Sequence, residues 1–185
     1  MKYQVRYLIS FLIMVTFHLD TSIAQPSLNG FLNIPFGTKM ETAKKLLLQK
    51  PGVKFIRQCD RNNLYFTGLS LGAYKVDTCF LMESLLKGKF ESSNLVFYSK
   101  AELLEEIYEL HCAKYGNPTT TYSEDNDVLY RWEFPVKGSK YVNSITLKSV
   151  SAADYFMLNY SGMGTLCPGW LQQYSHKTKN NAEDF

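Results

Sequence analysis

Short runs of alternating apolar and polar residues recur through most of the chain, and they limit its fold more than any other feature. These runs cover residues 53–58, 63–69, 73–82, 89–98, 128–134, 141–148 and 154–160. Such alternation predicts β-strands that bury one face. The connections between the runs are too short to contain a parallel crossover, so the strands are expected to form antiparallel meanders.

Two other segments have the three- and four-residue apolar spacing of amphipathic helices. The first begins with Thr38-Lys39-Met40-Glu41, which reads as a capping box, and stops at Pro51-Gly52. The second begins with Ser99-Lys100-Ala101-Glu102, another capping box, and stops at Gly116-Asn117-Pro118. The apolar stripes of both segments predict helices that each pack against a sheet.

The order of helix and strands occurs twice, which suggests an internal repeat. We expect an α+β fold in which two helix-plus-antiparallel-strand units, at residues 25–99 and 100–165, form a curved sheet with both helices on one face. Residues 166–185 are expected to form a polar C-terminal tail. The opposite face of the sheet would then meet solvent or a partner.

The N-terminus has the pattern of a secretory signal peptide. Lys2 and Arg6 precede an apolar stretch, residues 7–17, that is too short for a permanent membrane helix. Small residues in Ser22-Ile23-Ala24 predict cleavage after residue 24, with no Cys beside the cut to accept a lipid. We therefore expect an exported protein, periplasmic or secreted, with no membrane span after cleavage.

Four cysteines, at positions 59, 79, 112 and 167, follow the predicted cut. An exported chain can form disulfides, and four cysteines allow three pairings. We favour Cys112 with Cys167, because the first closes a predicted helix and the second lies in a tail with little else to fix it; buried free thiols are the alternative. No Cys-x-x-Cys or Cys/His ligand set occurs, so we predict no metal and no cofactor.

Charge argues against a nucleic-acid partner. The formal net charge is +3, and the lysines and arginines form no cluster that would neutralise a phosphate backbone. Oligomeric state has no signature in the sequence.

The segment Ile34-Pro35-Phe36-Gly37-Thr38, a strand-like run that ends in Phe-Gly before a capped helix, resembles the opening of two exported families. These are the β-lactamase inhibitory proteins and the small outer-membrane-assembly lipoproteins. The second unit departs from this pattern, with Phe97-Tyr98-Ser99 in place of Phe-Gly-Thr. The resemblance implies a binding scaffold whose open sheet face contacts another macromolecule, and it implies no chemistry.

One motif would suit an enzyme. Gly68-Leu69-Ser70-Leu71-Gly72 matches the Gly-x-Ser-x-Gly elbow of serine hydrolases, with His111 or His176 as the base. An elbow needs a helix after the serine, whereas residues 73–77 continue as strand. Because this helix is missing, a small envelope serine hydrolase using Ser70 ranks second, as the alternative function.

Acidic residues form two clusters that have simpler explanations than metal binding. Residues 123–127 lack the spacing of a calcium loop and are expected to form a solvated connection. Glu102, Glu105, Glu106 and Glu109 are expected to lie on the exposed side of the second helix.

Aromatic residues are abundant in the predicted strands, and they cannot all face the helices. These strand aromatics are Tyr65, Tyr74, Tyr98, Tyr130, Trp132, Tyr141, Tyr155 and Tyr160. Because Tyr and Trp are enriched at binding hot spots, Tyr130 and Trp132 are the candidate binding residues. The function expected from the sequence is an exported, soluble, non-enzymatic binding protein of the bacterial cell envelope that holds a protein or a glycan on its open sheet face.

Overall fold

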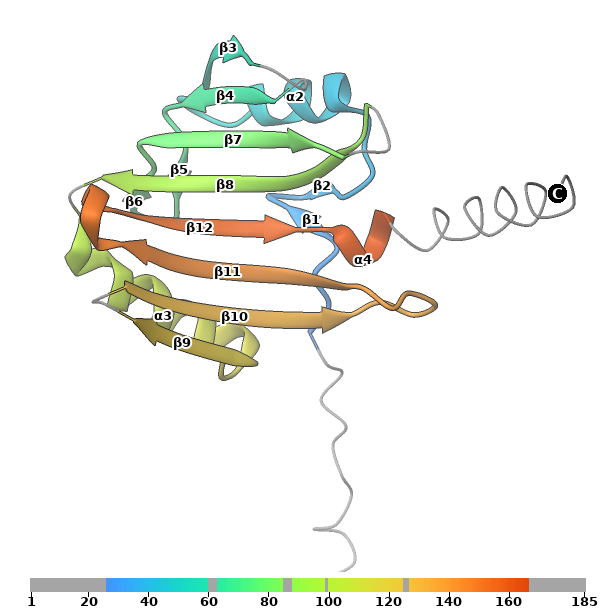
Figure 1. Cartoon of the computed structure of the whole chain (residues 1–185). Helices are drawn as coiled ribbons and strands as arrows, with labels where there is room; N and C mark the ends of the chain where they lie inside the picture. The colour runs from blue at the N-terminus through green and yellow to red at the C-terminus, as the bar shows by residue number, and fades with distance from the viewer. Residues whose placement is uncertain (1–25, 60–62, 85–87, 99, 125–126, 167–185) are drawn as a thin grey trace, which may run out of the picture.

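An eight-stranded antiparallel sheet forms the centre of the protein (Figure 1). The computed structural model describes residues 26–59, 63–84, 88–98, 100–124 and 127–166. The strands lie in the order β3-β4-β7-β8-β12-β11-β10-β9. Their bounds are β3 Lys54–Gln58, β4 Leu64–Thr67, β7 Thr78–Glu83, β8 Phe90–Tyr98, β9 Thr120–Glu124, β10 Asp127–Pro135, β11 Val142–Val150 and β12 Tyr155–Ser161. The predicted α+β class and antiparallel pairing are confirmed.

Strand order gives the sheet two halves that meet in the middle. The first four strands follow one another from the β3 edge inward, and the last four follow one another from the β9 edge inward. The final strands of the two halves, β8 and β12, pair with each other, and Leu95 lies opposite Leu158. The two edges of the sheet are therefore β3 and β9.

Two helices precede the two halves, namely α2 (Met40–Leu48) before β3 and α3 (Ala101–Tyr115) before β9. Both end where the sequence predicts, ahead of Pro51-Gly52 and at Gly116. The first capping box is wrong, because Lys39 is the residue before α2 and makes no side-chain cap. The Thr38 hydroxyl instead donates a hydrogen bond to the Pro35 carbonyl at 2.7 Å. Ser99, of the second predicted box, lies outside the described residues.

Several short elements complete the described chain. Two short hairpins form two-stranded sheets separate from the main sheet. They are β1 (Gly30–Phe31) with β2 (Ile34–Pro35), and β5 (Ser70–Leu71) with β6 (Tyr74–Lys75). A 3₁₀ turn, η2 (Ser151–Ala153), precedes β12, and one helical turn, α4 (Met163–Leu166), follows it. The single strand predicted at residues 73–82 is divided into β6 and β7. The predicted loop at 123–127 is also partly wrong, because residues 123 and 124 belong to β9.

Alternation along the strands divides the sheet side chains into a core face and an outer face. One unbroken row of the core face crosses all eight strands and runs Phe55, Phe66, Cys79, Leu95, Leu158, Leu147, Tyr130 and Thr121. The middle members of this row have 0% exposure. A row of the outer face runs Arg57, Tyr65, Phe80, Asn94, Asn159, Thr146, Arg131 and Thr120, and we call it the outer row.

The helices and the sheet meet through aromatic contacts. The α3 residue His111 lies 5.5 Å from the Trp132 ring and 6.2 Å from the Tyr160 ring. The ammonium of Lys44 on α2 lies 3.7 Å above the Phe55 ring centroid. These contacts use side chains of the core face.

The first described residues also belong to the core. Leu28, Phe31 and Ile34 are buried, and the Phe31 ring lies 5.2 Å from that of Tyr160. The buried Asn143 amide donates to the Leu28 carbonyl at 2.6 Å, and its oxygen accepts from the Thr165 amide at 2.9 Å. One side chain of β11 thus fixes both ends of the described chain.

Two predicted segments fall outside the described residues, namely the signal peptide at 1–24 and the tail from residue 167 onward. Within the described ranges, no helix is long and apolar enough to cross a membrane.

Candidate binding face

The two residues predicted to bind a partner lie on the core face. Trp132 has 2% exposure, and its indole N–H donates to the Gly116 carbonyl at 2.8 Å. The Tyr130 ring packs 4.4 Å from that of Tyr108 on α3. Sequence alternation separates two sets of side chains but does not say which set faces a helix. The structure therefore corrects the expectation that Tyr130 and Trp132 are available on the open face.

The aromatic side chains of the outer face form pairs. Tyr65 and Phe80 lie on neighbouring strands with ring centroids 4.3 Å apart at 81°, and the Arg57 guanidinium lies 5.3 Å from the Tyr65 ring. Tyr98 and Tyr155 form a second edge-to-face pair, 5.9 Å apart at 67°. Pairs of this geometry are attractive because the edge of one ring meets the negative face of the other.

Amide side chains occupy the centre of the outer row. The Asn159 amide donates to the Asn94 side-chain oxygen at 2.6 Å across the β8–β12 junction, and to the Ser93 carbonyl at 3.3 Å. The Asn94 amide in turn lies 2.9 Å from the Met82 sulfur. These bonds fix the orientation of both amides, so polar atoms are held in place where the two halves of the sheet meet.

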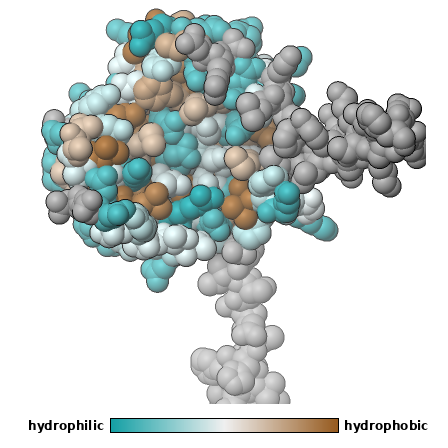
Figure 2. Space-filling model, viewed as in Figure 1, coloured by the Kyte–Doolittle hydropathy of each residue, from teal (hydrophilic) through white to brown (hydrophobic). Residues whose placement is uncertain are grey.

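Apolar side chains lie next to the amides. Val96 and Met157 are opposite each other on β8 and β12, and Val96 is 6% exposed. In Figure 2, drawn from the same side as Figure 1, hydrophobic side chains form separate patches among hydrophilic ones over the strands. The outer face thus alternates aromatic, amide and aliphatic groups at fixed positions.

The alternative catalytic residue lies in a hairpin. Ser70 is exposed on β5, and the chain continues into β6 instead of a helix. His111 is buried, with Nδ1 2.7 Å from the Ile107 carbonyl and Nε2 3.1 Å from the Tyr160 hydroxyl. Because a carbonyl only accepts, Nδ1 carries the proton and Nε2 accepts from Tyr160. Both ring nitrogens of His111 are therefore held by Ile107 and Tyr160, and His176 lies outside the described residues.

Burial shifts the pKa values of the hydrogen-bonded pair His111 and Tyr160. Burial lowers the pKa of His111, and it raises the pKa of Tyr160 well above its ordinary value. At neutral pH the pair is therefore uncharged, which suits its place between α3 and β12.

The cysteines of the described residues make no disulfide with one another. Cys79 is fully buried in the core row, and burial raises the pKa of its thiol to about 12. Cys59 and Cys112 are half-buried. The predicted partner of Cys112, Cys167, lies outside the described residues, so that pairing stays a prediction.

Of the two acidic clusters, residues 125 and 126 of the first lie outside the described residues. Among the residues that the structure describes, no group of three His, Cys, Asp or Glu side chains converges. Glu102, Glu105, Glu106 and Glu109 are exposed on α3, as predicted. Glu106 accepts a hydrogen bond from the Tyr74 hydroxyl at 2.8 Å, which connects α3 to the β5–β6 hairpin.

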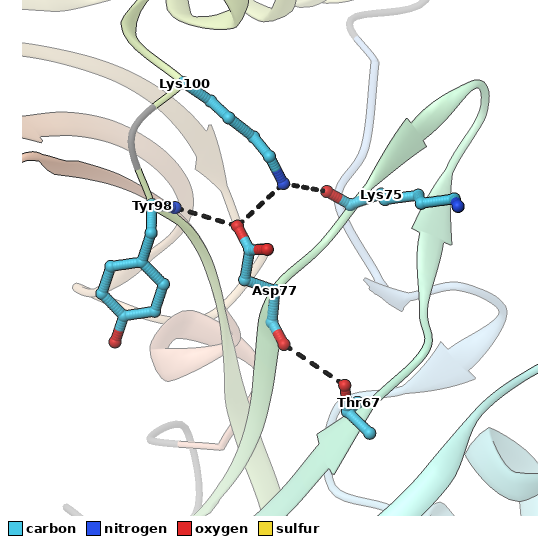
Figure 3. Close-up of polar contacts among 5 residues, drawn as sticks. All are labelled: Thr67, Lys75, Asp77, Tyr98 and Lys100. Atoms are coloured by element: carbon cyan, nitrogen blue, oxygen red, sulfur yellow. Dashed lines mark hydrogen bonds and ion pairs between the residues drawn. The ribbon is translucent and has the colours of Figure 1, made fainter.

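A polar cluster around Asp77 connects the first half of the sheet to α3 (Figure 3). The Asp77 carboxylate accepts from the Lys100 ammonium and from the Tyr98 amide, both at 2.9 Å. Lys100 also donates to the Lys75 carbonyl at 3.2 Å, and the Thr67 hydroxyl donates to the Asp77 carbonyl at 3.4 Å. Burial alone would raise the pKa of Asp77, but the bonds from Lys100 and Tyr98 outweigh burial and lower it. The cluster explains why the predicted strand is interrupted at this point.

A cavity of about 620 Å³ lies between the N-terminal hairpin and the C-terminal ends of both helices. Its lining includes Phe31, Leu71 and Tyr160, with Lys50 and Lys114 on its sides. Cations at these positions also suit the negative ends of the two helices, so the charges have a structural explanation.

No protein family, curated protein or solved structure matches the chain. The resemblance to the inhibitory proteins and assembly lipoproteins therefore stays a prediction. The residues of the outer face are the observations from which a function can be inferred.

Proposed function

We propose that this is an exported, non-enzymatic binding protein of the bacterial cell envelope that holds a protein partner on the outer face of its sheet. The observation that carries the proposal is the outer row, in which Tyr65, Phe80, Asn94 and Asn159 follow one another across β4, β7, β8 and β12. Aromatic rings and oriented amides side by side are the groups that supply contact area and direction at interfaces.

The proposed architecture explains why this face would be available. In it, residues 25–99 and 100–165 are two copies of a unit made of a helix and four strands. The copies join through β8 and β12, and both helices cover the core face. The contacts of His111 with Trp132 and of Lys44 with Phe55 support this arrangement.

Ring geometry favours a protein over a glycan. A sugar binds best to a flat, accessible ring face, whereas each outer-face pair is edge-to-face, at 81° for Tyr65–Phe80 and 67° for Tyr98–Tyr155. Met82, Met157 and Arg57 lie beside these rings on the same face. Methionine and arginine are enriched at protein interfaces, and methionine adapts its shape to an irregular partner.

The N-terminal sequence pattern supports the proposed location. The basic start, the apolar stretch and the small residues before position 25 are the pattern of a cleaved signal peptide. A periplasmic or secreted protein would present the outer face to other envelope components.

The test uses the mature chain, residues 25–185, to capture partners from an envelope extract, followed by calorimetry with the purified partner. Phe80→Ala and Met157→Ala should each weaken the affinity about fivefold or more, the loss expected when a residue contributes over about 1 kcal/mol. Leu110→Ala, which truncates a 52% exposed side chain on α3, is the matched control and should leave the affinity unchanged.

Two results would contradict the proposal. Unchanged affinity in both outer-face variants, with circular dichroism showing an intact fold, would place the partner elsewhere. Binding of an envelope glycan that depends on Phe80, without any protein partner, would show that the ligand class is wrong.

A further inference from the structure

The two edges of the sheet differ in how they resist pairing with another strand. On β3, the register with β4 shifts between Phe55 and Arg57, and the strand carries two cations, Lys54 and Arg57. A bulge and charged side chains are the usual devices that stop an edge strand from pairing with a further chain.

Strand β9 (Thr120–Glu124) has no bulge and no cation, and its one charged residue, Glu124, is at its end. It pairs with β10 in an unbroken register over all five residues, from Thr120 opposite Arg131 to Glu124 opposite Asp127. All five side chains are exposed, and the strand contains no Lys, Arg or Pro. Among the described residues, no strand lies on its other side.

The sequence of β9 is complementary to itself when two copies run antiparallel about Tyr122. Tyr122 then lies opposite Tyr122 of the other copy, Thr121 opposite Ser123, and Thr120 opposite Glu124. Aromatic pairs and hydroxyl pairs stabilise neighbouring strands, whereas like charges directly opposite destabilise them. This register contains the favourable pairs and places no charge opposite a like charge.

We propose that β9 of one copy pairs with β9 of a second copy in this antiparallel register, so that two eight-stranded sheets form one continuous sheet. Tyr122 lies opposite Leu129, whose neighbours across the sheet are Lys148 and Met157 of the outer face. The paired sheet therefore extends the outer face from one copy to the other. The pairing does not depend on the function proposed above.

The expected association is weak. Stable interfaces bury about 1,200–2,000 Å² in total, and one strand of five residues provides less than this. The fraction of chains in dimers should therefore rise with protein concentration and fall on dilution.

Disulfide trapping tests the register directly, with Tyr122→Cys and Thr121→Cys compared in the mature chain under mild oxidation. Two residues at position 122 face each other across the pair, about 4.5–5.5 Å apart between Cα atoms, which a disulfide can bridge. Residue 121 lies opposite residue 123 of the other copy, so the two residues at position 121 are two positions out of line. Their Cα atoms are then roughly 8 Å apart, which a disulfide cannot bridge. Non-reducing electrophoresis should show at least tenfold more covalent dimer for Tyr122→Cys than for Thr121→Cys or the unmodified chain.

Sedimentation provides a second measurement that needs no cysteine. Tyr122→Lys places two like charges opposite each other and should abolish the concentration-dependent dimer, while Tyr122→Phe should keep it. Circular dichroism should show the same fold for both, because Tyr122 is 54% exposed. Equal trapping at positions 121 and 122, or an unmodified chain that stays monomeric at millimolar concentration, would overturn the proposal. So would a dimer that Tyr122→Lys leaves intact.

Discussion

At Gly162, directly after β12, adding one methyl group should disturb the fold measurably. A Cβ atom there would lie 2.1 Å from Cγ and 2.5 Å from Cβ of Phe36. The Gly162 amide donates to the Glu91 carbonyl at 2.8 Å, so the backbone cannot easily withdraw. Phe36 is 5% exposed and packs 5.6 Å from the Phe90 ring, so it has no open space to enter.

Gly162→Ala should therefore lower the free energy of unfolding by about 1–3 kcal/mol, the usual cost of overfilling a packed core. Phe36→Ala alone should cost about 3–5 kcal/mol, because it removes a buried ring and leaves a cavity. In the double variant, the clash with Cγ of residue 36 disappears and the one with its Cβ remains, so the added methyl group is relieved in part. The two costs should then fall short of additivity by at least about 1 kcal/mol.

Urea unfolding monitored by circular dichroism measures all three variants. The control pairs Gly162→Ala with Phe66→Ala, which lies in β4, three strands away from β12, and whose cost should simply add. If Gly162→Ala changes the unfolding free energy by less than about 0.5 kcal/mol, or couples equally to Phe66 and Phe36, the reasoning about this contact is refuted.

Two further predictions concern titratable groups. His111 is buried and uncharged with a lowered pKa, so the unfolded state binds a proton at a higher pH than the folded state does. The free energy of unfolding should therefore fall as pH drops below about 6.5 toward the folded pKa. His111→Gln should flatten this slope in urea titrations between pH 7.5 and 5. A slope that persists in the variant would assign it to another group. The lowered pKa of Asp77 means that its contribution exists above the ordinary carboxyl pKa and disappears as pH falls through the folded value. Asp77→Asn should cost less than about 1 kcal/mol at pH 7, because the pair with Lys100 is partly exposed, and a loss that is equally large at pH 2 would count against the ion pair.

Local sequence signals predict the elements that depend on local chemistry. The ends of α2 and α3 follow from Pro51-Gly52 and Gly116, which stop a helix whatever surrounds it. Most strands follow from alternation, because a strand with one buried face must alternate. Strand β9 escapes this signal for the same reason: its five residues are all exposed, so burial leaves no pattern in its sequence.

One local contact and one set of contacts between distant residues explain the remaining errors. Thr38 resembles an N-cap, but the Pro35 carbonyl competes for its hydroxyl, and Lys39 takes the position before the helix. The predicted strand at 73–82 is interrupted because Asp77 binds Lys100 and the Tyr98 amide, more than twenty residues away. No window of local sequence contains both Asp77 and these two partners.

The assignment of the candidate binding face depends on the same kind of distant contact. Alternation places Tyr130 and Trp132 on one side of β10 and Arg131 on the other, but it is symmetric between the two sides. The choice is made by α3, where Tyr108 and His111 pack on Tyr130 and Trp132 and leave the Arg131 side in the outer row. Loss of binding in a Trp132 variant would therefore report a damaged core, whereas loss in a folded Phe80 variant would report the outer face. The two outcomes separate a structural role from a binding role on the same sheet.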